Sequence, residues 1–192
     1  MRAWPYLLFA SVLSAVYILL FLAPGHMTGL ALVPSKVSSG EFWRFLTYPF
    51  IHLDINHLAK NLIGFALVTV GIVELKTKFS DFSSIYLLAG FLAVLPLWFI
   101  FQFTALGASV AIYSAFGLIA LESKKYEIKP WHLILVTLAL IFADALVSKT
   151  STSTMSAFSH LSGLLFGLFA FSFSFKVHEV FEKKRSFCLR RI

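Results

Sequence analysis

The chain has 192 residues, of which 59% are hydrophobic and 13% charged, and its formal net charge is +7. A soluble core of this size does not need so much apolar surface, whereas runs of about 20 apolar residues span a bilayer. We therefore expect an all-α membrane domain over residues 1–175 and a basic cytoplasmic tail, 176–192. The positive charge is best explained by its location, and it does not indicate a nucleic-acid partner.

Six apolar runs predict six membrane spans. The first, residues 5–23, is longer than the apolar region of a signal peptide usually is, which favours a retained helix over a cleaved leader. The third contains Pro96, which we expect to kink its helix. The second, third, fifth and sixth predicted spans are residues 51–73, 83–101, 130–148 and 157–175.

The fourth predicted span, residues 107–121, is short. Its fifteen residues reach about 22 Å, less than the hydrocarbon thickness of about 30 Å. Residues 102–106 carry no charge, so the chain reverses close to or within the membrane, where irregular backbone needs shelter from protein or a water-filled cavity. The pattern predicts a short central helix with Ser109 at the floor of a wet cavity.

The second span begins with unusually polar residues, and polar groups inside a membrane are costly and often functional. His57 and Asn61 lie on one helix face, and both can donate hydrogen bonds to a developing negative oxygen. Interhelical hydrogen bonding is the simpler alternative for both. We expect Lys60 to extend toward the membrane surface and Asp144 to stand alone in its span.

Small residues, Gly107 and Ala108, precede Ser109, and Tyr113 and Gly117 follow it on the same helix face. Glycine relaxes the backbone limits just before the helix begins. Alone, such a serine is more simply explained by a hydrogen bond to the preceding turn or to a neighbouring helix.

In the sixth span, His160, Gly163 and Gly167 share one face, and the two glycines favour close packing of another helix. If the fourth span packs there, His160 reaches Ser109. An isolated interhelical hydrogen bond is again the alternative for this histidine.

The long connection of residues 24–50 contains the pair Trp43-Arg44. This pair either anchors the connection among lipid headgroups or braces the loop internally, since both roles use the same chemistry. No HExxH pattern occurs, and His52 does not share a helix face with His57, so we expect neither a metal site nor a cofactor.

Lysine and arginine are distributed unevenly. Alternating the six spans puts twelve of the 16 cations on one side and three on the other, with Lys60 inside a span. Because cations gather on the cytoplasmic side, we expect both termini in the cytoplasm, the tail against anionic lipids, and a plasma-membrane location. The ends carrying His57, Ser109 and His160 then face outward.

These motifs together resemble the rhomboid family of intramembrane serine proteases, in the right order over roughly residues 40–170. Any one of them is weak, but five in order are specific. They are Trp43-Arg44, His52-xxxx-His57-xxx-Asn61, Gly71-xx-Glu74, Gly107-Ala108-Ser109 with Tyr113 and Gly117, and His160-xx-Gly163-xxx-Gly167.

The resemblance implies the minimal six-helix form of that family. It also implies two kinds of partner, transmembrane protein substrates and membrane lipids. It implies that Ser109 is the nucleophile and His160 the base, without an aspartate. His57, Asn61 and the backbone N–H of Ser109 would stabilise the oxyanion, and Tyr113 would pack against His160. The chain's size also permits the role of the short relatives called rhombosortases, which process C-terminal anchors.

One position departs from the family pattern, because Val110 stands where the second motif glycine belongs. Its β-branched side chain is stiffer and bulkier, which changes the pocket or impairs the enzyme. Two functions therefore stay open: an active protease, and a non-catalytic membrane protein that binds clients. A transporter is a distant third, because no internal repeat or pair of broken helices occurs.

Overall fold

The computed structural model describes residues 2–148 and 154–172, so the predicted tail, Lys149 and the end of the sixth span lie outside the described residues. In the described part, the regular elements are all helices joined by connections, and the β-type pairing is one isolated bridge. In chain order its elements are α1 (Trp4–Leu22), α2 (His26–Leu30), α3 (Pro34–Ser38), α4 (Arg44–Thr47), η1 (Tyr48–Phe50), α5 (Ile55–Glu74), α6 (Phe79–Leu92), α7 (Leu95–Phe101), α8 (Ser109–Glu122), η2 (Ser123–Tyr126), α9 (Pro130–Ser148) and a final helix, Thr154–Ser172.

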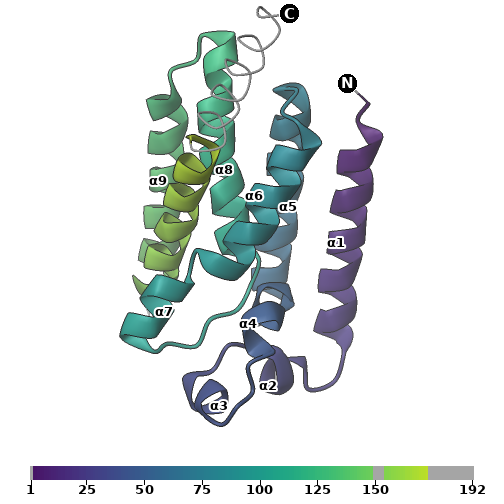
Figure 1. Cartoon of the computed structure of the whole chain (residues 1–192), viewed down its shortest axis with the longest axis vertical. Coiled ribbons are helices and arrows are strands. Elements are labelled where there is room, and N and C mark those ends of the chain that lie inside the picture. Colours follow the sequence, from purple (N-terminus) through teal and green to yellow (C-terminus); the bar gives the residue numbers. More distant parts are fainter. Residues whose placement is uncertain (1, 149–153, 173–192) are drawn as a thin grey trace, which may run out of the picture.

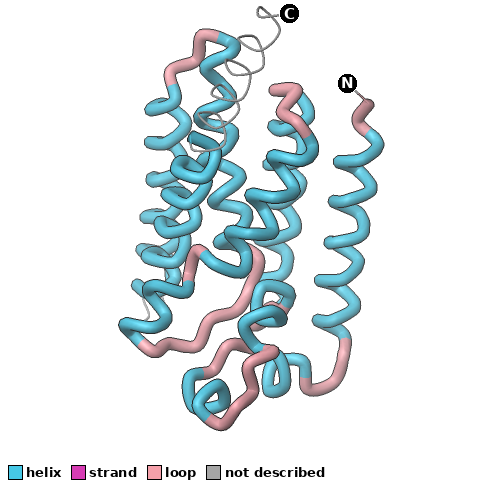
Figure 2. Tube along the Cα trace, viewed as in Figure 1, coloured by secondary structure: helices cyan, strands magenta, loops and turns pink. Residues whose placement is uncertain are grey.

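Four of these helical stretches are long and apolar enough to cross a membrane: α1, α5, the α6–α7 stretch and the final helix. Shorter apolar helices accompany them, and Figure 2 shows all of them running side by side. The predicted all-α, multi-pass membrane fold is therefore confirmed. The helix of the third span breaks at Ala93 and Val94, directly before Pro96 in the first turn of α7, where proline is tolerated.

Helix α8 is the central helix, packed against α5, α6 and α9 (Figure 1). It has 14 residues and carries small side chains, such as Ala111, Ser114, Ala115 and Gly117, that are buried among its neighbours. Because these residues are small, neighbouring helices can approach α8 closely. The predicted short fourth helix is thus observed, beginning at Ser109, two residues later than the pattern suggested.

The irregular segment before α8 is held by the long first connection. Leu32 and Ala105 exchange two backbone hydrogen bonds of 3.0 Å, and the N–H of Gly107 donates to the carbonyl of Tyr48 at 3.0 Å. Both loops therefore meet at the end of the bundle where α8 starts. Three backbone polar groups of this segment, on Ala105 and Gly107, therefore have protein partners, which is the kind of shelter that irregular chain needs at membrane depth.

The first connection is itself organised around a buried arginine. Arg44 donates to the carbonyls of Ala31 at 2.6 Å and Thr28 at 2.8 Å and pairs with Glu41. Trp43 stays exposed and donates to the carbonyl of Gly29 at 3.3 Å. Arg44 therefore braces the loop internally, which is one of the two roles predicted for this pair.

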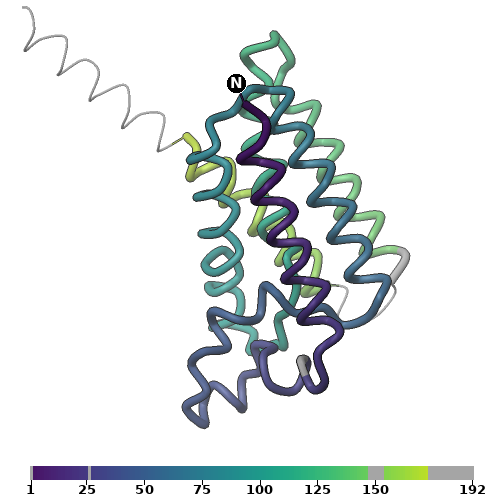
Figure 3. The backbone as a smooth tube through the Cα atoms, turned by 90° about the vertical axis from the view of Figure 1, so that its right-hand side faces the viewer, coloured from purple at the N-terminus to yellow at the C-terminus, as the bar shows by residue number. Residues whose placement is uncertain are grey.

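Helix α1 packs along α5 and α6 through aromatic rings, and Figure 3 shows it crossing the front of the bundle. The ring of Phe9 meets those of Phe65 and Tyr86 edge-on, at 6.1 and 6.0 Å between centroids. Deeper along the helix, the hydroxyls of Tyr17 and Tyr86 lie 3.0 Å apart. Such edge-to-face contacts orient α1 relative to the site-bearing helices.

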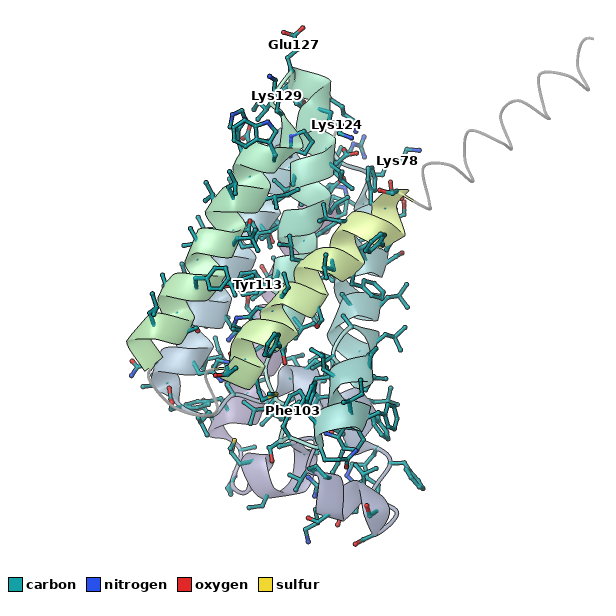
Figure 4. The ribbon with its side chains drawn as sticks, turned by 90° about the vertical axis from the view of Figure 1, so that its left-hand side faces the viewer. Lys78, Phe103, Tyr113, Lys124, Glu127 and Lys129 are labelled. Atoms are coloured by element: carbon teal, nitrogen blue, oxygen red, sulfur yellow. The ribbon has the colours of Figure 1, made fainter. Side chains whose placement is uncertain are left out.

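The end of the bundle opposite the first connection is polar and basic. Figure 4 shows Lys78, Lys124 and Lys129 there, whereas Phe103 lies toward the other end. At the basic end, the buried Glu122 accepts a hydrogen bond from Thr77 at 3.0 Å, and the hydroxyl of Tyr6 donates to the carbonyl of Thr77 at 2.6 Å. These bonds tie α1, α8 and the connection after α5 together.

Candidate active site

Ser109 is the first residue of α8, in the end of the bundle that the first connection covers. The preceding residue, Ala108, supplies no side-chain cap for the helix. The first turn of a helix has N–H groups without intrahelical partners, and it carries a partial positive charge. The hydroxyl of Ser109 therefore lies beside backbone donors that favour negative charge.

His160, on the final helix, meets Ser109 directly. Its Nε2 and the Oγ of Ser109 lie 3.0 Å apart, and the residue is buried. The ring of Tyr113, one turn beyond Ser109, stacks on the imidazole with centroids 4.4 Å apart at 27°. Figure 4 shows Tyr113 between α9 and the final helix, partway along the bundle. The Nδ1 of His160 has no hydrogen-bond partner within residues 2–148 and 154–172, so the stacked ring constrains the imidazole.

Glycines let α8 and the final helix come this close. A Cβ on Gly163 would overlap the carbonyl oxygen of Val110, and one on Gly167 would overlap that of Ser114. From the other side, a Cβ on Gly117 would lie 2.7 Å from the carbonyl oxygen of Leu164. The two backbones are thus in direct contact, one to two turns from His160, and this contact sets the distance to Ser109.

His57 lies in the first turn of α5, and one contact fixes its backbone while another assigns its ring nitrogens. Asp54 caps this helix by accepting from the N–H of His57 at 2.8 Å. The N–H of Leu53 donates to Nδ1 of the His57 ring at 3.3 Å. Because Nδ1 accepts, the ring proton belongs on Nε2, which makes Nε2 a donor.

The donor side of His57 faces the segment just before Ser109. A Cβ built on Gly107 would lie 2.7 Å from both Cε1 and Nε2 of the imidazole. Gly107 also has a φ of 99°, a conformation that side chains rarely tolerate. Glycine is therefore needed at this position for two reasons: the backbone has a positive φ, and the His57 ring leaves no room for a Cβ.

Asn61 lies one turn further along α5 and is buried. Its Nδ2 donates to the carbonyl of His57 at 2.8 Å, which leaves one N–H of the amide available. Its Oδ1 has no hydrogen-bond partner among the described residues. The side chain therefore lies against the same turn as His57, with unused hydrogen-bonding capacity.

The remaining predicted site residues lie around this core or away from it. His52 is buried against His57, with ring centroids 5.2 Å apart. Val110 is buried in an apolar cluster that includes Tyr48 and Trp98. Glu74 is the last residue of α5, about 25 Å along the helix from His57, and its carbonyl accepts from Tyr126. Trp43 and Arg44 belong to the first connection, not to the Ser109–His160 pair.

Three contacts near the site were not anticipated from the sequence. Lys60 donates to Asp144 of α9 at 2.8 Å, while its side chain stays mostly exposed and Asp144 is the only acidic residue of α9. The two residues are 84 positions apart, and nothing in either helix pattern links them. The Oγ of Ser156 lies 3.4 Å from Nε2 of His160, and Tyr17 packs edge-on against His52.

No group of three or more potential metal ligands occurs among the described residues. His52 and His57 approach each other through ring edges, because His52 lies in the connection before α5. The side chains that do meet at this site offer a hydroxyl, an imidazole and hydrogen-bond donors.

Comparison with known proteins identifies the family. A model of the rhomboid domain matches residues 39–176. The chain is 31% identical over 140 residues to rhomboid protease GluP of Bacillus subtilis, covering 71% of this chain and 27% of that protein. It is 33% identical over 140 residues to rhomboid-related protein 1 of Caenorhabditis elegans, covering 68% and 39%. It is 27% identical over 155 residues to rhomboid-type serine protease 2 of Neurospora crassa, covering 71% and 52%.

This chain is a member of the rhomboid family, and it is a multi-pass membrane protein. The matched segments span about half of the curated relatives' lengths or less. Among these relatives, one is named a rhomboid protease and another a rhomboid-type serine protease.

Proposed function

We propose that this chain is an intramembrane serine endopeptidase in which Ser109 is the nucleophile and His160 the base. The distance of 3.0 Å between Oγ of Ser109 and Nε2 of His160 carries the proposal. The hydroxyl oxygen attacks the carbonyl carbon of the scissile bond while its proton moves to Nε2. His160 then gives that proton to the leaving amine. In the second half of the reaction His160 takes a proton from water, the water oxygen attacks the acyl carbon, and His160 returns the proton to the departing Oγ of Ser109.

The oxyanion of the tetrahedral intermediate needs donors that are already in place. The backbone N–H of Ser109 at the start of α8, Nε2 of His57 and Nδ2 of Asn61 are the proposed donors. The support for His57 is its tautomer, because the Leu53 N–H occupies Nδ1. The close approach of the imidazole to Gly107, two residues before Ser109, supports the same role.

The substrate in this proposal is a transmembrane protein with a single membrane helix. Its scissile bond must leave the helix, because hydrogen-bonded backbone within a helix shields its amides. We therefore expect helix-destabilising small residues near the outer end of the substrate helix. In this proposal the end of the bundle at which α8 starts, with Ser109, faces outward. The end where Figure 4 shows Lys78 and Lys124 faces the cytoplasm by the positive-inside rule.

The test uses the purified chain in proteoliposomes with a transmembrane model substrate. We expect Ser109→Ala and His160→Ala each to abolish cleavage, and the double variant to be hardly worse than either, because the two residues act as a unit. Ser114→Ala is the matched control: Ser114 is buried on the same helix and bonded only to the carbonyl of Ala111 at 2.7 Å, within the described residues. Full activity of either single variant would refute the dyad.

A fluorophosphonate probe separates the protease from the client-binding alternative, for which Val110 is the sequence hint. Covalent labelling at Ser109, lost in Ser109→Ala and kept in Ser114→Ala, supports the protease. A folded wild-type protein that never labels and never cleaves supports a non-catalytic binder on the same scaffold.

A further inference from the structure

Tyr17 of α1 lies at the start of a series of buried ring contacts that ends at the proposed oxyanion donor. Its side chain is fully buried, and its hydroxyl pairs with that of Tyr86 on α6 at 3.0 Å. Its ring meets the ring of His52 edge-to-face, with centroids 5.3 Å apart at 66°. Tyr17 is therefore held at one end by α6 and presses on His52 at the other.

His52 transmits this contact to His57. The two imidazoles meet edge-to-face at 5.2 Å and 67°, and His52 is completely buried. His52 lies in the short connection between η1 and α5, and its ring contacts those of Tyr17 and His57. These contacts connect the position of Tyr17 to that of His57.

His57 needs such support because its backbone contacts do not fully fix the ring. The Leu53 N–H defines which nitrogen accepts, but at 3.3 Å it is a long bond that leaves the ring plane free to tilt. A tilt moves Nε2 relative to Gly107 and the start of α8. Misplacing a catalytic group by about 1 Å can cost on the order of 100-fold in rate.

We propose that Tyr17 is a positioning residue for catalysis, acting through His52 to hold the His57 ring in its donor orientation. This inference rests on the proposed protease function and gives α1, which carries none of the proposed catalytic groups, a role in the site. In this proposal the ring of Tyr17 positions His57 through His52, and the hydroxyl of Tyr17 anchors the Tyr17 ring on Tyr86.

The chain offers a matched control on the same helix. Tyr6 is equally buried, and its hydroxyl also donates a hydrogen bond, to the carbonyl of Thr77 at 2.6 Å. That bond lies at the basic end of the bundle, three turns of α1 away from Tyr17. Tyr6→Leu therefore removes a comparable side chain without touching His52.

Steady-state cleavage by folded enzyme in proteoliposomes tests the proposal. We expect Tyr17→Leu to lower kcat by about 10-fold to 100-fold with KM within about 2-fold, as for a misplaced transition-state donor. Tyr6→Leu should leave kcat within about 2-fold of wild type. Tyr17→Phe, which keeps the ring, should recover most of kcat even where it lowers the melting temperature. Tyr17→Met replaces Tyr17→Leu if the latter does not fold.

Ring-nitrogen NMR of histidine-labelled protein, with signals assigned by His57→Gln, provides a readout independent of turnover. In the wild type and in Tyr6→Leu, His57 should show a proton on Nε2 and an accepting Nδ1. In Tyr17→Leu its signals should move toward a mixture of tautomers. Unchanged His57 signals, or equal kcat in Tyr17→Leu and Tyr6→Leu, would overturn the inference. A wild type without activity would defeat the proposed function, while these signals would still decide the positioning.

Discussion

The side chain of Asn61 already makes a hydrogen bond within the protein in the absence of substrate. One of its two amide protons bonds the carbonyl of His57, so at most one is available to an oxyanion. That bond also fixes the amide plane against the turn that carries His57. The arrangement suits a donor that is held in place before the reaction begins.

For Asn61→Ala we expect turnover to fall by roughly 10-fold to 1000-fold with little change in substrate affinity, as for loss of one oxyanion donor elsewhere. Single-turnover kinetics separate chemistry from binding. Thr69→Ala is the control, because Thr69 is buried further along α5 and bonds back to the carbonyl of Phe65. A change confined to affinity would mean that Asn61 contacts the substrate, not the transition state.

Val110 combines two environments in one residue. Its carbonyl faces Gly163 of the final helix, and its side chain belongs to the buried cluster that includes Trp98. The residue that departs from the family motif is therefore part of the packing beside Ser109.

We expect Val110→Gly to leave Ser109 reactive toward a fluorophosphonate and to broaden the residues accepted beside the scissile bond. It should also lower stability by about 2–4 kcal/mol, because it empties buried volume and places glycine in a helix. A substrate library and thermal unfolding measure the two effects, and Val110→Ala separates lost packing from helix propensity. An inactive wild type rescued by glycine would identify a pseudoprotease. An unchanged substrate profile would place the side chain outside the pocket.

At the scale of elements, the contact between α8 and the final helix decides whether the site forms. Both helices approach until backbone meets backbone, and this requires glycine at Gly163 and Gly167. The carbonyl groups opposite them, on Val110 and Ser114, belong to the same helix as Ser109. The backbone contact between the two helices therefore also sets the distance between Ser109 and His160.

Gly167→Ala should separate the two helices, because the added Cβ meets a backbone carbonyl that cannot move aside alone. We expect a loss of about 1–3 kcal/mol or more in stability, together with a large loss of cleavage. Gly29→Ala is the control, since a Cβ there has nothing within 4 Å. Wild-type thermal unfolding and turnover in Gly167→Ala would show that the close contact is dispensable.

Much of this arrangement follows from helical spacing. The shared face of His160, Gly163 and Gly167 predicts that another helix packs closely against the final helix, whereas only the structure shows that this helix is α8. The contact between Lys60 and Asp144 could not be predicted, because helical spacing says nothing about which exposed side chains meet across 84 residues. Whether the site residues perform the proposed chemistry remains a prediction for the variants above.

The role of the pair Trp43-Arg44 in the first connection also could not be predicted from the sequence. The aromatic and basic pair Trp43-Arg44 is compatible with either a lipid anchor or an internal brace, because both use the same groups. Only the fold decides, since the carbonyls that Arg44 binds come from α2 and the residue after it. Local sequence carries no information about which distant carbonyls a buried guanidinium will find.

At the scale of the whole molecule, the two ends differ in charge. The end with Lys78, Lys124 and Lys129 is basic, whereas the other end holds the first connection and the start of α8 (Figure 4). The positive-inside rule therefore predicts that the basic end lies in the cytoplasm.

We expect Lys36→Cys, in a Cys188→Ser background, to react with an impermeant thiol reagent added outside intact cells. Lys124→Cys should react only after the membrane is opened. Both lysines are exposed and lie in opposite end regions, which makes them a matched pair. The reverse pattern would place Ser109 on the cytoplasmic side and contradict the proposed substrate orientation.

The placement of the two halves of the dyad on α8 and the final helix has a consequence for biosynthesis. Membrane chains are made from the N-terminus, so α1, α5, α6 and α8 are inserted before the helix that carries His160. Under the proposed mechanism, Ser109 has no base until that helix packs into the glycine contact. A half-made protein would then be chemically inert toward the membrane proteins around it, and Ser109 would become competent in the same event that completes the bundle.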